Sequence, residues 1–582
     1  MKNKSGSPAE KNAHQNETIR VKFEIQNNSL CLICFFNGEI RIHEKKMTGF
    51  NPSSEQTMMY YFCWVLNTIR PLFFSMPVAD IKVEYTQECK DKINNMIVFA
   101  YNLLKNTNDT LRRISDGKNI TQSNENALFF NVGENVNFRK IYRNCLKKDP
   151  SRLRYLDFDP GFNPVERRWE KTPPPMTVDE FVRYIQENRI RKIVSINHYL
   201  LEKYQDQGIY ILAVFKYIGL EYIIIDLDNY DLTLHGYLYK SYYNVEEFDR
   251  FSYAEFHVFW DRYYGLSNVN RIVFTHEDKK RFAFQELDED YHIVVMSNSR
   301  LNDVVSMLNP ILFILGEFKE GSFFEELALW YYSMRDMILS SMDLSEYERL
   351  NFNALLLRFA YNASQFIKYS VIDEIKTDRK IELYGDAGWQ TLFPEYYLTY
   401  LDRKGIDKVF SEGRSLNLLM NWQLTWLETS AVIFEALNYR VPFLNHPAIV
   451  KTEKLKAMSH IEYSAPADLN LKLRNIKPYL NKDLVQSIDY LNSFCNGNMD
   501  FIVSKIYSDR VKKENNETIA AELKKHDHLL AERVNAYILK QYDFLRFTFK
   551  SLFIEPAPFD IRQSLYFSKP FMQRLIQYAN KK

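Results

Sequence analysis

The sequence predicts an α/β protein made of two doubly wound domains, with a small α/β module before them and a helical extension after them. Three observations lead to this prediction. Short apolar runs alternate with helical patterns between residues 127 and 275 and again between 293 and 444, which is typical of parallel sheets covered on both faces. The chain has 582 residues, which is more than one hydrophobic core usually holds. After residue 465 the pattern becomes mainly helical.

The N-terminal part reads as a polar tail followed by the small module. Residues 1–17 carry no periodic apolar pattern, so we expect a disordered tail. Residues 18–120 are predicted to form the α/β module. Short strands are expected between 19 and 41, with turns at Asn27-Asn28 and Asn37-Gly38, and helices are expected near 54–69 and 88–114.

Residues 121–290 are predicted to form the first Rossmann-like domain. Helical patterns at 178–188 and 199–218 separate some of its apolar runs. The predicted strands are 127–132, 153–157, 192–196, 222–226 and 271–275.

Residues 291–465 are predicted to form the second Rossmann-like domain, and residues 466–582 the helical C-terminal extension. Two such domains in tandem create a cleft, and ligands of these sheets bind beyond the carboxyl ends of the strands. The extension includes an amphipathic pattern at 518–549. The predicted strands of the second domain are 293–296, 380–384, 415–420 and 441–444, with helices at 324–339, 347–369 and 430–439.

Composition excludes several functional classes. The net charge is +1 at pH 7, which gives no field to attract a polyanion, so we expect no nucleic-acid partner. The sequence has no uncharged run of the ~18 to 20 residues that cross a bilayer. Its polar N-terminus does not resemble a secretory signal, so we expect a cytoplasmic protein. The CxxC pair Cys31 and Cys34 lacks a second pair or a nearby histidine, so we expect no metal there.

The segment from 381 to 450 carries the most chemical information. It contains Leu-Tyr-Gly-Asp-Ala-Gly-Trp at 383–389, Ser-Leu-Asn-Leu at 415–418, Phe-Glu-Ala-Leu at 434–437 and Val-Pro-Phe-Leu at 441–444. Glu435 lies inside an apolar helical pattern, where an unpaired carboxylate is costly to bury. Either Glu435 accepts hydrogen bonds from the two hydroxyls of a ribose, or it is an exposed glutamate on an amphipathic helix.

These four runs resemble the donor domain of GT-B glycosyltransferases, in the group called glycosyl transferases group 1, including its spore-maturation-like branch. The resemblance extends loosely from 292 to 450 and is sharpest from 430 to 444. It implies a transferase that moves a sugar from a nucleotide-sugar donor to an acceptor hydroxyl. The second domain would hold the donor and the first domain would shape the acceptor site. No metal or other cofactor is implied.

The resemblance also assigns the donor-binding residues. It implies that Glu435 binds the donor ribose and that Thr429 and Ser430, at a helix start, lie near the diphosphate, where a helix N-terminus favours an anion. Arg300 looks like the arginine that this group places against the diphosphate, where a fixed cation offsets negative charge. Gly385 and Asp386 lie on a turn after a strand, where glycine lets the backbone approach a ligand closely.

The sequence does not settle the stereochemistry. Retaining members of the wider group carry two glutamates separated by seven residues, whereas Glu428 and Glu435 are separated by six and Leu427 holds the expected place. Arg440 stands where the group usually has a glycine after the helix. Retention and inversion of the anomeric configuration therefore both remain open.

Other interpretations compete with this one. Asp226-Leu227-Asp228 and Asp157-Phe158-Asp159 each follow an apolar run, and Asp-x-Asp holds a divalent metal in GT-A glycosyltransferases. In the GT-B interpretation, Asp228 and His198 are instead candidates for the base that deprotonates the acceptor. Another alternative is a non-catalytic protein that binds or scaffolds with the same fold. A third is that the same two-domain architecture works as a nucleotide-sugar epimerase or hydrolase.

The acceptor is a glycan, a lipid-linked glycan or a protein, and the sequence does not distinguish them. The aromatic and basic stretch at 541–574 either contacts a membrane surface peripherally or packs back on the first domain.

Overall fold

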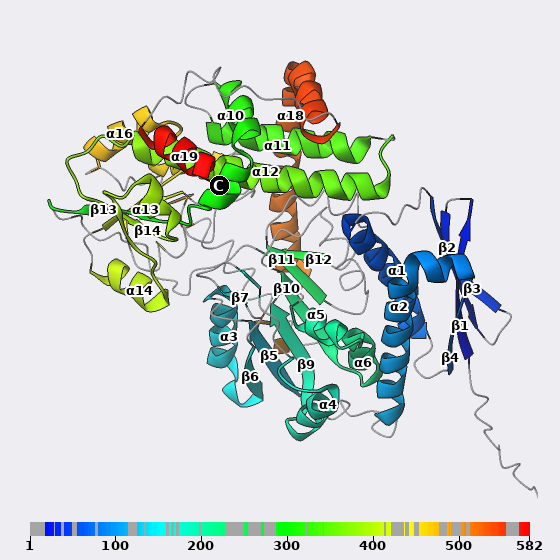
Figure 1. The fold of residues 1–582 in the computed structure, drawn as a ribbon. Coiled ribbons are helices and arrows are strands. Elements are labelled where there is room, and N and C mark those ends of the chain that lie inside the picture. The colour runs from blue at the N-terminus through cyan, green and yellow to red at the C-terminus, as the bar shows by residue number, and fades with distance from the viewer. Residues whose placement is uncertain are drawn as a thin grey trace, which may run out of the picture.

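The structure is a computed structural model with parallel sheets in two regions (Figure 1). Among the residues that it describes, the strands form one four-stranded, one six-stranded, one five-stranded and one two-stranded sheet. The described residues are 18–27, 29–36, 40–48, 55–75, 80–114, 125–132, 136–158, 162–163, 168–169, 174–196, 199–226, 249–253, 269–272, 287, 289–319, 323–341, 343–412, 415–420, 436, 441–446, 453–476, 483, 486–487, 489, 503–504, 506–507, 513–554 and 570–581.

The N-terminal module is a sheet with two helices. In strand β1, Ile19, Val21 and Phe23 alternate with half-buried polar residues, so one face of the sheet is apolar. Strand β2 is antiparallel to β1 and β3, and β4 is parallel to β1. The elements are β1 (Thr18–Gln26), β2 (Ser29–Phe36), β3 (Ile40–Thr48), α1 (Glu55–Ser75), β4 (Asp80–Tyr85) and α2 (Gln87–Arg113).

The first parallel sheet has the strand order β12-β11-β10-β9-β5-β6, and neighbouring strands in it are parallel. The chain reverses its direction of travel across the sheet between β5 and β9, which makes this the topological switch point. The strands are β5 (Asn126–Val132), β6 (Leu153–Phe158), β9 (Ile190–Ile196), β10 (Glu221–Asp226), β11 (Asp249–Tyr253) and β12 (Val269–Ile272), and the helices are α3 (Val136–Lys148), α4 (Val178–Glu187), α5 (Tyr199–Asp206) and α6 (Ile211–Tyr217). A short hairpin consists of β7 (Phe162–Asn163) and β8 (Arg168–Trp169).

The second parallel sheet has the order β15-β14-β13-β16-β17. The chain moves outward from β13 to β15 and then returns to the other side of β13, so the switch point lies between β13 and β16. The strands are β13 (His292–Met296), β14 (Ile381–Tyr384), β15 (Tyr397–Thr399), β16 (Ser415–Leu419) and β17 (Phe443–Asn445). The helices are α9 (Leu301–Ser306), α10 (Leu308–Gly316), α11 (Phe323–Ser340), α12 (Glu346–Asp373), α13 (Gly388–Leu392) and α14 (Arg403–Ser411).

The predicted α/β class with parallel sheets is therefore confirmed. The prediction of one helix over 199–218 is wrong, because the chain turns between α5 and α6. Gly208 has φ of 73° there, and its N–H donates to the Gln205 carbonyl over 2.8 Å. Glycine takes this left-handed conformation without steric strain.

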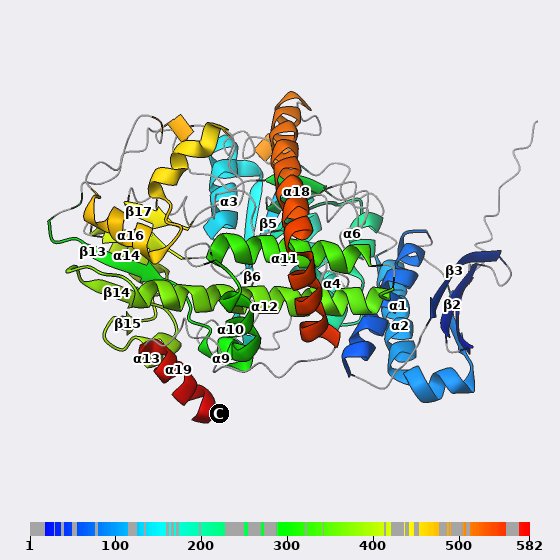
Figure 2. The same ribbon diagram turned by 90° about the horizontal axis from the view of Figure 1, so that it is seen from above.

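Two long helices, α11 and α12, run side by side across the molecule (Figure 2). The start of α12 contacts the N-terminal module, where the Tyr60 hydroxyl donates to Glu346 over 3.2 Å. The end of α12 lies near β13 of the second sheet, where the Lys368 ammonium donates to the Ser297 hydroxyl. One continuous helix therefore joins the N-terminal module to the second parallel sheet.

The C-terminal part contacts both parallel-sheet regions. Val503 and Ile506 belong to the same core cluster as β5, β9 and β10. Helix α18 (Lys513–Phe549) packs on α11, and α19 (Pro570–Lys581) packs on α13 and α9. The shorter elements before α18 are the 3-10 helix η3 (Glu453–Ile461) and α16 (Pro466–Arg474). None of the described helices is long and apolar enough to cross a membrane.

Candidate functional site

The candidate site lies at the carboxyl end of β13, beside the switch point of the second sheet. The loop Ser297–Arg300 follows β13 and leads into α9, and Asp386 follows β14. Because β13 and β14 are parallel neighbours, their following loops leave the sheet at the same edge. The site therefore combines residues that are nearly 90 positions apart in the sequence, since Ser299 and Asp386 are separated by 87 positions.

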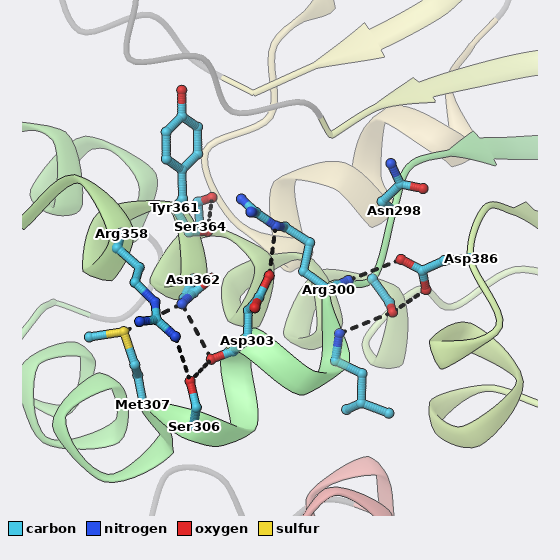
Figure 3. A network of polar contacts seen from close by, with 12 residues as sticks. Asn298, Arg300, Asp303, Ser306, Met307, Arg358, Tyr361, Asn362, Ser364 and Asp386 are labelled. Atoms are coloured by element: carbon cyan, nitrogen blue, oxygen red, sulfur yellow. Dashed lines mark hydrogen bonds and ion pairs between the residues drawn. The ribbon is translucent and has the colours of Figure 1, made fainter. Parts of the chain in front are cut away.

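Asp386 fixes the shape of the loop after β13. Its carboxylate accepts hydrogen bonds from the Ser299 hydroxyl, from Arg300 N over 3.2 Å and from Gly388 N over 3.0 Å. Ser299 itself is fully buried and accepts from Leu301 N over 3.3 Å. Figure 3 shows Asp386 on the backbone side of Arg300. Its negative charge is thus engaged with backbone N–H groups and a hydroxyl.

The two glycines around Asp386 let the loops after β13 and β14 lie in direct contact. Gly385 has φ of 153°, and a Cβ there would collide with the Ser297 carbonyl oxygen. A Cβ on Gly388 would collide with the Ser299 hydroxyl. The close approach predicted for Gly385 is therefore made to the neighbouring loop. Gly385 and Asp386 act on the site by positioning the Ser297–Arg300 loop.

Arg300 has an unusual backbone conformation. Its φ of 52° and ψ of 33° are left-handed, which costs a non-glycine residue about 1 to 2 kcal/mol. Its Nε lies 3.3 Å from Asp303 Oδ2, and its guanidinium carbon lies 5.8 Å from the centre of the Tyr361 ring. The side chain therefore extends away from Asp386 and towards α12 (Figure 3).

Helix α12 is tied to α9 beside this arginine. The Asn362 amide donates to the Asp303 carbonyl over 3.3 Å, and an Arg358 Nη2 lies 3.5 Å from the Ser306 hydroxyl (Figure 3). These contacts hold the face of α12 that carries Tyr361 against the start of α9. They place the α12 side chains at the edge of the site.

Lys368 is a second cation in the site, and the sequence analysis did not single it out. Its side chain is 3% exposed, and its Nζ donates to the Ser297 hydroxyl over 3.1 Å. Burial, with the charge of Arg300, lowers the pKa of Lys368 to about 7. Gln365, one turn earlier on the same face of α12, is also buried, and its Oε1 has no hydrogen-bond partner among the residues that the structure describes.

Two aromatic side chains hold the loop carbonyls. The Tyr369 hydroxyl donates to the Ser299 carbonyl, and Trp389 Nε1 donates to the Ser297 carbonyl, each over 2.5 Å. Burial raises the pKa of Tyr369 well above its ordinary value, so its hydroxyl stays a donor at neutral pH. Trp389 is fully buried, so its ring belongs to the core.

The predicted site residues divide into two sets. Arg300, Gly385 and Asp386 come together at the carboxyl ends of β13 and β14, as described above. The other predicted residues lie outside the described part of the chain: Glu435, Ser430, Thr429, His198 and Asp228.

The described residues next to these undescribed ones show at which edge of each sheet their segments start or end. Ala436 is fully buried, and its carbonyl accepts from Val441 N over 3.0 Å. Strand β16 is paired with β13, so the segment after Leu419 begins at the same edge as Ser297. In the first sheet, β9 ends two residues before His198 and β10 ends two residues before Asp228.

The described site contains two cations, Arg300 and Lys368, and two carboxylates. Asp303 pairs with Arg300, and the charge of Arg300 also lowers the pKa of Lys368. The Asp386 charge is engaged with N–H and O–H donors. Within the described residues, no group of three or more His, Cys, Asp or Glu side chains could hold a metal ion.

No protein-family model matches the chain, and no curated protein matches it.

Proposed function

We propose that the protein is a glycosyltransferase of the GT-B type, which transfers a sugar from a nucleotide-sugar donor to an acceptor hydroxyl. The observation that carries this proposal is the pair of cations, Arg300 and Lys368, at the carboxyl end of β13. That position adjoins the switch point of the second sheet, where doubly wound sheets bind their nucleotide ligands. The donor diphosphate is the anion that we assign to it.

The chemistry of transfer gives the cations a role. When the bond between the sugar and the diphosphate breaks, negative charge builds up on the departing nucleotide. A cation held in place before the reaction stabilises that charge more strongly than water does, because it needs no reorganisation. Arg300 is always protonated and can bind two phosphate oxygens at once, so it is the main candidate for this role.

The remaining roles belong to residues outside the described part of the chain. Glu435 would accept hydrogen bonds from the ribose, and Thr429 and Ser430 would lie near the diphosphate. In the first domain, His198 and Asp228 follow neighbouring parallel strands, β9 and β10, and are candidates for the base that deprotonates the acceptor.

A ligand screen tests the proposal. Thermal shifts are measured with nucleoside diphosphates and with a panel of nucleotide sugars, because a ligand that binds the native state raises the melting temperature. Release of free nucleotide is then measured with and without EDTA. We expect a donor to bind and turn over at a rate that EDTA leaves unchanged. A rate abolished by EDTA would instead favour the Asp-x-Asp, metal-dependent alternative.

Two substitutions locate the donor. Arg300→Ala and Glu435→Ala should each weaken donor affinity by about 1.5 to 3 kcal/mol, or roughly 10- to 150-fold, through loss of charge-assisted hydrogen bonds. Arg474→Ala is the matched control, because Arg474 is an exposed arginine on α16. If no nucleotide or nucleotide sugar binds at millimolar concentration, the proposal fails. Binding without turnover would leave a non-catalytic binding protein of the same fold.

A further inference from the structure

Lys368 has a feature that the fold alone does not explain. Its charged end is buried, and within the described residues its hydrogen-bond partner is a neutral hydroxyl, that of Ser297. A buried cation without an opposite charge is costly, and proteins usually pair it or bind a ligand to it. Lys368 therefore points to a ligand of opposite charge.

The described carboxylates near Lys368, Asp303 and Asp386, do not provide the missing charge. Asp303 pairs with Arg300, and Asp386 accepts from Ser299 and two backbone N–H groups. The Tyr369 hydroxyl donates to a carbonyl. Arg300 is the charged group that acts on Lys368, and its charge opposes protonation of Lys368.

The elements packed against α12 carry the other titratable groups that surround Lys368. Helix α10 has no titratable side chain. The titratable groups on the other surrounding elements are Asp303 on α9; Asp386 after β14; Arg358, Tyr361, Tyr369 and Asp373 on residues 358–373 of α12; Glu325, Glu326, Tyr331, Tyr332, Arg335 and Asp336 on α11; and Arg574, Tyr578 and Lys581 on α19.

We propose that Lys368 and Arg300 together bind a doubly negative phosphate or sulfate anion at the carboxyl end of β13, and that Lys368 takes up a proton when this anion binds. The geometry supports the first part, because Arg300 ends the loop that follows β13, and Lys368 on α12 donates to Ser297 at the start of that loop. The inference rests on the proposed function for the identity of the natural ligand, which would be the diphosphate of the donor. The anion site itself depends only on the contacts described above.

The proton balance follows from the surroundings of Lys368. In the free protein, burial and Arg300 hold the pKa of Lys368 at about 7, so at pH 8 most molecules carry a neutral amine. A bound dianion favours the charged ammonium, which takes its proton from the solvent. When the anion leaves, the proton returns to the solvent. Affinity must therefore fall as the pH rises above 7.

Sulfate is a suitable probe because it keeps its full charge across neutral pH, whereas phosphate titrates in that range. Sulfate affinity is measured on the full-length protein by titration calorimetry between pH 6.5 and pH 8.5. We expect affinity to fall by roughly 20-fold over this interval. Near pH 8, the observed heat in two buffers of different ionisation heat should show an uptake of about one proton for each sulfate.

Three variants assign the proton to Lys368. Lys368→Met should weaken sulfate binding at pH 6.5 and remove most of the pH dependence. Lys368→Arg keeps a charge at all these pH values, so it should keep affinity and lose the pH dependence. Lys376→Met is the matched control, since Lys376 is an exposed lysine just after the same helix, and it should behave like the wild type. Because histidines titrate in the same range, the comparison with Lys368→Met separates their contribution.

Each outcome decides between the two proposals. An unchanged pH dependence in folded Lys368→Met, or no pH dependence in the wild type, overturns the inference even if nucleotides bind. Sulfate binding with the expected pH dependence, in a protein that binds no nucleotide or nucleotide sugar, supports the anion site and refutes the glycosyltransferase proposal. If Lys368→Arg does not fold, the methionine variant and the buffer experiment still give the answer.

Discussion

The buried charged side chains at the two ends of β13 and β14 differ in their partners. At the amino end, Glu382 accepts hydrogen bonds from Lys380 over 2.7 Å and from Tyr384 over 2.9 Å, and His292 Nδ1 lies 3.0 Å from the same carboxylate. At the carboxyl end, Lys368 is buried with a hydroxyl as its hydrogen-bond partner. The same pair of strands thus has a satisfied ion cluster at one end and, at the other, a buried cation whose hydrogen-bond partner among the described residues is a hydroxyl.

This difference separates stability from function. A satisfied carboxylate adds to folding stability, whereas a buried lysine without a counter-charge lowers it. Features that oppose stability persist where they serve a ligand. The left-handed conformation of Arg300 lies at the same end as Lys368, so two unfavourable features coincide at the carboxyl end. The comparison predicts that removing the charge of Lys368 and removing the charge of Glu382 change stability with opposite signs.

The largest effect is expected for Lys368→Met in the free protein. Burial lowers the pKa of Lys368 from 10.5 to about 7, so the unfolded chain holds this proton more tightly between those values. Native stability therefore rises with pH through that window, and the lysine lowers it most below pH 7. Replacing the cation with an apolar side chain of similar length should raise the free energy of unfolding by about 3 to 5 kcal/mol at pH 6.

Denaturant unfolding at pH 6 and pH 9 measures this effect. The gain should be clearly smaller at pH 9, because the wild-type lysine is then neutral in the native state. Lys376→Met, at an exposed position, should change stability by less than about 0.5 kcal/mol at both pH values. A loss of stability in Lys368→Met at pH 6 would show that the lysine is well solvated or paired, and the contrast between the two ends would disappear.

Asp386→Ala should destabilise the carboxyl end by about 2 to 4 kcal/mol. It leaves Arg300 N, Gly388 N and the buried Ser299 hydroxyl without their shared acceptor, and each unsatisfied group carries a penalty. Asp402→Ala is a matched control, because Asp402 accepts from a single backbone N–H, that of Gly405, at the start of α14. Its loss should cost only about 1 kcal/mol.

Chemical denaturation measures both aspartate variants. Equal losses for the two variants would mean that Asp386 contributes no more than an ordinary helix cap. The assignment of Asp386 as the residue that shapes the Ser297–Arg300 loop would then be wrong.

Gly385→Ala should cost about 2 to 3 kcal/mol, because the new methyl group meets the Ser297 carbonyl and the φ of 153° strains any side chain. Gly316→Ala is the control at the end of α10, where a Cβ meets nothing within 4 Å. That change should be neutral or slightly stabilising. Thermal melts of both variants provide the measurement, and a stable, folded Gly385→Ala would remove the packing role given to this glycine.

The fold was predictable where the sequence pattern is local and strong. The strands around Ile193, Ile224 and Val294 are continuous apolar runs, and each appears in the structure. Strands β4, β11 and β15 were missed because they are short and rich in polar residues or lie at a sheet edge. The strand order could not be predicted from the sequence either, because it depends on which strands pair across long connections.

The site was predictable only in part, for a similar reason. Arg300 and Asp386 stand next to strand ends, which is a local signal. Lys368 lies inside a predicted helix between Phe366, Ile367 and Tyr369, and a single lysine in such an apolar run could have been noticed. The absence of a counter-charge among its described neighbours could not be predicted, because it depends on α9, β13 and the loop after β14 together.

The smallest effect is expected at the amino end, for Glu382→Gln. Burial raises the pKa of the Glu382 carboxyl, but the hydrogen bonds from Lys380 and Tyr384 and the nearby positive charges outweigh it, so the pKa lies below its ordinary value of 4.5. The stabilisation is therefore fully present above pH 4.5 and is lost as the pH falls through the lowered value. Glutamine should cost about 1 to 3 kcal/mol at pH 7 and much less near pH 3, as measured by urea unfolding at both pH values. A cost at pH 7 is opposite in sign to the gain expected for Lys368→Met, and a gain in both variants would mean that burial of charge, rather than the missing counter-charge, distinguishes the two ends.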